Sequence, residues 1–235
     1  AKSMIQRGNS INKIRNYFIL SKRTILNKID HSKLTAKPET EDFSGKYEDS
    51  GFIAKYLVNN YFKAVERLLF KTNNVKTAHE IGVGEGLSTL RLSKMVESLT
   101  ASEYVEELVE IAKKNNPKLK VFQESVYELQ YQNSSIDLVF LLEVLEHLDY
   151  PEAALEELKR ISKQYLILGV PREPLWRFLN ICRLKYLKNF GNTTGHLNHW
   201  SKKSIIRLIE KKYGKVIAVE SVIPWIIVLA EKRKN

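Results

Sequence analysis

The segment His79-Glu80-Ile81-Gly82-Val83-Gly84-Glu85-Gly86 decides the fold. It follows a short apolar run that begins at Thr77 and precedes a helical pattern over 88–96, so it predicts a turn between a strand and a helix. Glycines at alternating positions let the backbone turn tightly and approach a ligand near a helix N-terminus. A dinucleotide-binding loop would need glycine where this chain has Leu87, and Glu80 would repel a pyrophosphate. The loop therefore favours a cationic ligand over a phosphate.

Short apolar runs alternate with helical patterns from residue 77 onward, which is typical of βαβ units on a parallel sheet. The expected strands are 77–83, 97–102, 120–123, 136–142, 165–170, 216–221 and 225–230. The expected helices are 51–70, 88–96, 104–114, 151–162 and 201–212. The sequence therefore predicts an α/β fold.

The net charge of +11 is unevenly distributed along the chain. Residues 1–37 carry a charge of +8, residues 38–171 a charge of −7 and residues 172–235 a charge of +10. Basic flanks suit an anionic partner, either membrane headgroups or nucleic acid, and an acidic middle suits a cationic ligand. Solubility is the alternative explanation of the basic flanks.

Two regions of different texture divide the chain. Residues 1–50 are expected to form a basic amphipathic extension, with apolar residues at helical spacing over 10–30, followed by a linker. Residues 51–235 are expected to form the main domain. Since the chain shows no run of eighteen apolar residues, no signal peptide and only one cysteine, Cys182, we expect a cytoplasmic protein. Peripheral attachment to a membrane through the basic extension stays open.

Two further motifs stand where expected strands end. Glu103 can accept two hydrogen bonds from the vicinal hydroxyls of a ribose, or it can favour the positive end of the helix that follows. The fourth strand runs into I-D-L-V-F-L-L-E-V-L-E-H-L over 136–148. Together with E-I-G-V-G-E-G and Ser102-Glu103, this segment resembles the class I S-adenosylmethionine-dependent methyltransferases, with a likeness that spans about Lys76 to Ala230. Several motifs that agree in order and spacing are more specific than any one of them.

The resemblance extends to the type 11 and ubiquinone-biosynthesis methyltransferases, and it implies the architecture of this protein. It implies a Rossmann-like, seven-stranded, mostly parallel sheet with strand order 3-2-1-4-5-7-6. A helical N-terminal extension precedes this sheet, and a lid at about 171–200 lies between strands five and six.

The resemblance also implies that S-adenosylmethionine is the cofactor, with Glu80 near its ammonium group and Glu103 on its ribose. Ser125 stands where many relatives have an aspartate that receives the adenine amino group. A serine can still accept one hydrogen bond, and the N–H of Val126 can serve a ring nitrogen. The implied cofactor-binding residues are Glu80, Gly82, Gly84, Gly86, Glu103, Ser125, Val126 and Leu142.

Glu143, Glu146 and His147 have the spacing i, i+3 and i+4, which predicts that all three share one face of a helical turn. Oxygen and imidazole ligands suit Mg²⁺ or another divalent metal. The motif is similar to the E-x-x-E-H of the ubiquinone-biosynthesis and small-RNA 2′-O-methyltransferases, which implies a metal. The alternative is a metal-free site in which His147 is the general base. The candidate catalytic residues are His147, Glu143, His196 and His199.

The segment 171–190 follows the fifth strand and combines apolar with basic residues, as an amphipathic cationic helix does. It suits an anionic lipid surface, or it packs as a lid on its own domain. Arg172 and Trp176 are the candidate substrate contacts. We expect O-methylation of a small-molecule or lipid-linked acceptor, with metal-dependent RNA 2′-O-methylation as the alternative. A non-catalytic module that binds nucleic acid or membrane is the alternative from another class.

Overall fold

The computed structural model describes residues 29–36 and 51–233. Residues 1–28 and 37–50 lie outside this part, and with them most of the expected basic amphipathic extension and linker. The chain divides into two units between Leu34 and Thr35. In the first unit, the described residues form one turn of 3-10 helix, His31–Lys33. In the second unit, the carboxylate of Asp149 accepts hydrogen bonds from the N–H groups of Thr35 and Ala36, at 2.8 and 2.9 Å.

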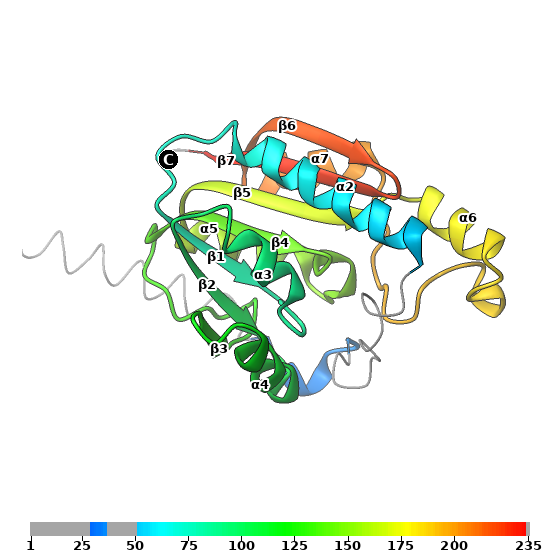
Figure 1. Ribbon diagram of the computed structural model, residues 1–235, viewed down its shortest axis with the longest axis horizontal. Coiled ribbons are helices and arrows are strands. Elements are labelled where there is room, and N and C mark those ends of the chain that lie inside the picture. Colours follow the sequence, from blue (N-terminus) through cyan, green and yellow to red (C-terminus); the bar gives the residue numbers. More distant parts are fainter. Residues whose placement is uncertain (1–28, 37–50, 234–235) are drawn as a thin grey trace, which may run out of the picture. The chain divides into compact units, whose positions relative to one another are not determined.

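The second unit is built on a seven-stranded sheet in the order β3-β2-β1-β4-β5-β7-β6 (Figure 1). Strands β1 to β5 run parallel to their neighbours, and β7 runs antiparallel to both β5 and β6. The strands are Thr77–Ile81 (β1), Ser98–Glu103 (β2), Lys120–Gln123 (β3), Ile136–Leu142 (β4), Ser162–Pro171 (β5), Gly214–Val222 (β6) and Trp225–Lys232 (β7). The predicted fold class and strand order are confirmed.

Helices cover both faces of the sheet (Figure 1). The described helices of this unit are Phe52–Leu69 (α2), Leu87–Leu92 (α3), Glu106–Asn115 (α4), Pro151–Ile161 (α5), Leu175–Cys182 (α6) and Lys202–Lys212 (α7), with the 3-10 turns Leu145–His147 (η3) and Leu187–Asn189 (η4). Because successive side chains of a strand point to opposite faces, Leu138 and Phe140 pack with α2 and α3, whereas Val139 and Leu141 pack with α5 and α7. This double cover explains why β4 is apolar almost throughout.

Element boundaries differ from the predictions where the backbone leaves regular geometry. Strand β1 ends at Ile81, two residues before the predicted end, because Gly82 has a φ of 71°. Helix α3 ends at Leu92, four residues early, in a turn closed by backbone hydrogen bonds from Ser93, Lys94 and Met95. None of the described helices has the length and apolar character needed to span a bilayer.

The expected amphipathic helix after β5 is shorter than its periodicity indicates. Helix α6 ends at Cys182, and Leu184 and Tyr186 have φ values of 56° and 54°. The N–H of Lys185 donates to the carbonyl of Asn180, at 2.8 Å, and the buried Asn180 amide donates to the carbonyl of Gly191, at 2.9 Å. These bonds turn the chain back on itself and end the helix, although the apolar residues continue at helical spacing in the sequence.

His79 is a buried polar residue in the middle of the sheet. Its ring shares hydrogen bonds with the hydroxyls of Thr100, Ser102 and Tyr131, at 2.9, 3.0 and 3.1 Å. Burial lowers the pKa of His79 from 6.5 to about 3. The folded chain therefore holds a neutral imidazole at pH values where the unfolded chain is protonated.

We expect the free energy of unfolding to fall as the pH drops below 6.5 toward 3, because protons bind His79 only in the unfolded state. This contribution amounts to about 1.4 kcal/mol per pH unit. Urea unfolding at pH 7 and pH 5 measures it, and His79→Gln should remove that part of the slope. The comparison with the variant is needed because burial raises the pKa of Glu80, which has the opposite effect. Equal slopes in the two proteins would refute the assignment.

Candidate functional site

The loop after β1 is a left-handed turn that depends on glycine. Gly82, Gly84 and Gly86 have φ values of 71°, 54° and 78°, a region that side chains rarely adopt. A Cβ on Gly82 would lie 2.5 Å from Cγ2 of Val144, so Gly82 also allows β4's continuation to pack closely. A Cβ on Gly84 would meet nothing within 4 Å. The loop is therefore packed on one side and open on the other.

The open side of the loop borders a cavity at the carboxyl ends of β1 and β4. Residues of α2, of the glycine loop with the start of α3, and of the end of β4 line it: Tyr61, Phe62, Gly82, Val83, Gly84, Glu85, Leu87, Ser88, Leu142 and Glu143. The carboxyl ends of parallel strands are where open α/β sheets bind ligands. The contribution of α2 was missed by the sequence analysis, because no motif surrounds Tyr61 and Phe62.

Glu103 joins the glycine loop to the start of α4. Its carboxylate accepts hydrogen bonds from the N–H groups of Gly84, Tyr104 and Val105, at 2.8, 2.7 and 3.1 Å. The side chain is buried at the end of β2. Because an ionised carboxylate offers about four acceptor sites, three N–H donors leave capacity for a ligand hydroxyl.

Glu80 is buried at the end of β1, behind the residues that line the cavity. Its carboxyl group accepts a hydrogen bond from the Thr89 hydroxyl, at 2.6 Å. Burial raises the pKa of Glu80 to about 7. Glu80 therefore ties β1 to α3, and a nearby cation would favour its ionised form.

The predicted adenine contacts lie in the turn after β3. The hydroxyl of Ser125 accepts a hydrogen bond from the N–H of Tyr127, at 3.3 Å, and Val126 is buried in the core. Neither residue is among those that line the cavity, whereas Leu142 is.

Glu143 departs from the predicted helical turn. Its φ is 59°, its N–H donates to the carbonyl of Gly169 at 3.0 Å, and its carboxylate accepts from Nε1 of Trp225 at 2.7 Å. Only Leu145–His147 is helical, so the predicted helical turn with Glu143, Glu146 and His147 on one face is wrong. Glu143 is not among the residues whose ligand atoms group with those of Glu146 and His147.

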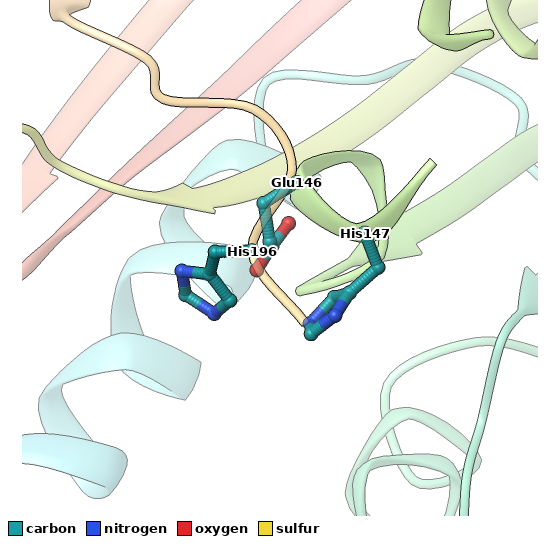
Figure 2. Close-up of side chains that lie close together, drawn as sticks. All are labelled: Glu146, His147 and His196. Atoms are coloured by element: carbon teal, nitrogen blue, oxygen red, sulfur yellow. The ribbon is translucent and has the colours of Figure 1, made fainter. Parts of the chain in front are cut away.

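His196 takes the third place in the cluster. Ligand atoms of Glu146, His147 and His196 lie within 4.8 Å of one another, and Figure 2 shows the three side chains converging. Glu146 and His196 are buried, and the rings of His147 and His196 meet edge to face at 4.9 Å. This group, the acid–histidine cluster, joins η3 to the loop before α7.

Backbone hydrogen bonds hold that loop against η3. The carbonyl of Glu146 accepts from the N–H groups of Leu197 and Asn198, both at 2.9 Å. The amide of Asn198 also donates to the carbonyl of Leu148, at 2.6 Å. The acid–histidine cluster is thus fixed by contacts between segments about fifty residues apart.

Aromatic rings connect the cavity to the cluster. Tyr61 contacts Trp225 at 5.0 Å, Trp225 contacts Trp176 at 6.0 Å, and Trp176 stacks on His196 at 5.9 Å between ring centroids. The indole N–H of Trp176 donates to the hydroxyl of Thr193, at 2.8 Å. We call Tyr61, Trp176 and Trp225 the aromatic wall, which sequence analysis found only in part.

Two predicted site residues lie apart from the cluster. His199 is exposed and shares hydrogen bonds with Arg177 and Asn192, at 2.8 and 2.7 Å. Partial desolvation of its ring, and next the positive charge of Arg177, lower the pKa of His199. Arg172 is exposed, and its N–H donates to the carbonyl of Pro224 at 2.9 Å. The structure thus brings His196 into the cluster and leaves His199 outside it.

Comparison with known proteins finds a similarity in the central part of the chain. Residues 79–167 match the model of a methyltransferase domain. No curated protein matches the chain.

Solved structures share the fold at low sequence identity. Magnesium protoporphyrin IX methyltransferase from Synechocystis PCC 6803, with bound S-adenosylhomocysteine, is 16% identical and superposes with a TM-score of 0.62 over 78% of this chain and 89% of that one. A S-adenosylmethionine-dependent methyltransferase from Aquifex aeolicus is 19% identical, with a TM-score of 0.56 over 73% and 89%. The N-methyltransferase NodS from Bradyrhizobium japonicum WM9 is 14% identical, with a TM-score of 0.59 over 76% and 98%.

The two sides of the glycine loop predict different costs of substitution. Gly82→Ala combines a left-handed backbone, about 1–2 kcal/mol, with overpacking against Val144, about 1–3 kcal/mol. Gly84→Ala has only the backbone cost, because its Cβ position is open. We expect Gly82→Ala to lower the free energy of unfolding by about 2–5 kcal/mol and Gly84→Ala by about 1–2 kcal/mol in urea titrations. Equal losses would contradict the one-sided packing of the loop.

Proposed function

We propose that the protein is a class I S-adenosylmethionine-dependent methyltransferase that transfers the methyl group to an oxygen atom of a small-molecule or lipid-linked acceptor. The observation that carries the proposal is the acid–histidine cluster, which the aromatic wall connects to the cavity beside the glycine loop. The cavity would hold the donor, and the cluster would act on the acceptor.

The glycine loop and Glu103 would position the cofactor. In this proposal the methionine end lies against the open side of Gly84, and the remaining acceptor capacity of Glu103 binds ribose hydroxyls. Glu80, whose pKa burial raises to about 7, would lose its proton as the cofactor's ammonium group approaches. Ser125 would accept a hydrogen bond from the adenine amino group, and the N–H of Val126 would donate one to a ring nitrogen. Leu142 would line the methyl-transfer end.

Methyl transfer from a sulfonium is an in-line displacement, so alignment of donor and acceptor is the main requirement. The bond between sulfur and the methyl carbon breaks as the bond to the acceptor oxygen forms, and the hydroxyl proton must leave. We assign His147 as the base that accepts this proton, because Glu146 can stabilise the resulting imidazolium. The products are S-adenosylhomocysteine and the methylated acceptor.

The aromatic wall favours an acceptor with a large apolar part. Trp176 and Trp225 offer two indole faces beside the cluster, and Tyr61 extends this surface to the cavity. Ligand sites of mostly aromatic lining with few polar groups suit small organic molecules. The solved neighbours named for magnesium protoporphyrin IX and for N-methylation show that the fold alone does not choose the acceptor.

A divalent metal is a second candidate chemistry for the same cluster. Glu146, His147 and His196 supply one carboxylate and two imidazoles, a donor set that suits Mn²⁺ or Zn²⁺ better than Mg²⁺. A bound metal would lower the pKa of an acceptor hydroxyl. Glu143, turned toward Trp225, is not part of this set.

We expect Glu103→Gln to weaken S-adenosylmethionine binding by roughly tenfold or more, because it removes a charge-assisted acceptor. Calorimetric titration of the folded variant measures this. Glu106→Gln is the matched control, since Glu106 is an exposed acid in the first turn of α4. Unchanged affinity in Glu103→Gln would remove Glu103 from the cofactor site.

Incubation of the protein with methyl-labelled S-adenosylmethionine and fractionated cell extract tests the acceptor class. We expect label on oxygen in the small-molecule or lipid fraction, and a rate about 10²–10⁴-fold lower in His147→Ala. His199→Ala should keep most of the activity, because His199 lies apart from the cluster. Label that appears only in RNA, or on nitrogen, would contradict the proposal.

The same assay separates the base from the metal. With His147 as the base, a chelator leaves the rate unchanged and calorimetry detects no Mn²⁺ binding. With a metal, the chelator abolishes activity, Mn²⁺ binds, and Glu146→Gln and His196→Ala lose the binding whereas Glu143→Gln retains it.

A further inference from the structure

The segment that follows the first turn of α6 presents apolar side chains to solvent. Phe178, Ile181, Leu184, Leu187 and Phe190 are exposed by 61, 41, 78, 52 and 80%. We call these five residues, with the interleaved Arg183, Lys185 and Lys188, the 178–190 face. Figure 1 shows α6 at one end of the second unit, beyond the carboxyl-terminal end of β5. Single exposed apolar residues are ordinary, but five of them within thirteen residues indicate an interaction site.

The backbone of the 178–190 face is held in place by buried contacts. Asn180 is buried, and its amide donates to the carbonyl of Gly191 and the hydroxyl of Thr193, at 2.9 and 3.2 Å. A Cβ on Gly191 would lie 2.3 Å from the carbonyl oxygen of Arg177, so the chain closes tightly there. The apolar side chains therefore point outward from a fixed turn.

Three residues of this turn have a costly backbone. Leu184, Tyr186 and Phe190 have φ values of 56°, 54° and 49°, although none is glycine. Each such conformation is unfavourable and persists only where the surrounding structure imposes it. Residues of this kind are concentrated at functional sites. Two of the three, Leu184 and Phe190, are also the most exposed residues of the face.

The charge around the face has one sign. Between residues 174 and 209 the chain holds seven lysines and arginines and no aspartate or glutamate. Arg183, Lys185 and Lys188 are exposed, and no ion pair joins them to any residue in the described part of the chain. The face thus combines apolar area with uncompensated positive charge.

We propose that the 178–190 face docks on an anionic lipid surface. Phenylalanine and leucine side chains can enter the boundary of the acyl chains while the lysines and arginine contact the headgroups. Charge complementarity favours this occupant over the chain's own residues 1–37, whose charge of +8 would repel the face. The three aliphatic and two phenyl side chains of the face also suit hydrocarbon better than RNA, where aromatic and arginine planes stack on bases.

The docking proposal goes beyond the proposed function and does not depend on the acceptor. Its consequence for the site is geometric: Trp176, in the first turn of α6, belongs to the aromatic wall. A membrane bound by the second half of α6 would therefore lie near the acceptor side of the site.

Cosedimentation of the full chain with vesicles tests the proposal. We expect binding to vesicles of phosphatidylglycerol and phosphatidylcholine and little binding to phosphatidylcholine alone, with affinity that falls as salt rises. Leu184→Asn with Phe190→Asn removes apolar area, and asparagine tolerates the left-handed backbone of both positions. We expect at least a tenfold loss of affinity. Reversal of Arg183, Lys185 and Lys188 to glutamate should abolish binding at low salt, since each charge near the surface contributes about fivefold.

The matched control reverses three exposed lysines elsewhere, Lys94, Lys114 and Lys118. It changes the net charge equally and should alter vesicle binding less than threefold. Equal losses in the control, or full binding by the asparagine variant, would overturn the docking face. If the protein binds single-stranded RNA and no vesicles, and the glutamate variant alone loses the RNA binding, the face is an RNA site instead. S-adenosylmethionine binding by calorimetry should be unchanged in all variants, which separates docking from the methyltransferase site.

Discussion

The hydrogen bonds between the carboxylate of Glu103 and the backbone of Gly84, Tyr104 and Val105 are the constraint on which the glycine-loop side of the site depends. They connect the ends of β1 and β2, which lie side by side in the sheet, and they fix the glycine loop in its left-handed turn. Since these backbone N–H groups are held by a buried carboxylate, the open side of Gly84 faces a cavity of fixed shape. Burial of Glu80 behind the loop adds a carboxyl group that responds to a cation.

The side of the site that holds the acid–histidine cluster is assembled differently, from segments that are far apart in the sequence. The carbonyl of Glu146 anchors the loop that carries His196, and Trp225 on β7 meets both Tyr61 on α2 and Trp176 on α6. Because the insertion between β5 and α7 supplies Trp176 and His196, changes in this insertion alter the cluster side of the site without altering the glycine loop that borders the cavity.

Residues with a left-handed backbone lie at both boundaries of the side of the site that holds the acid–histidine cluster. Glu143 ends β4 at the cavity, and Leu184, Tyr186 and Phe190 shape the exposed turn after α6. At Glu143 the strained residue redirects one carboxylate to Trp225, and in the outer turn the strained residues present apolar side chains to solvent. Backbone strain at both places is maintained by neighbouring hydrogen bonds, from Glu143 N–H to Gly169 and from Asn180 to Gly191.

The sequence by itself determined the α/β fold and the family resemblance, because apolar periodicity, glycine spacing and motif order are local properties that survive without contacts, and the strand order followed from the resemblance. Gly82, Gly84, Leu142 and Glu143, which the sequence assigns to the site, line one cavity, since carboxyl ends of parallel strands meet at one edge. Only the tertiary structure decided that His196, and not Glu143 or His199, joins Glu146 and His147. Helical spacing could not predict this, because one positive φ at Glu143 breaks the turn and a loop about fifty residues away supplies the partner. The inward positions of Tyr61 and Trp225 likewise depend on long-range packing, for which no local pattern exists.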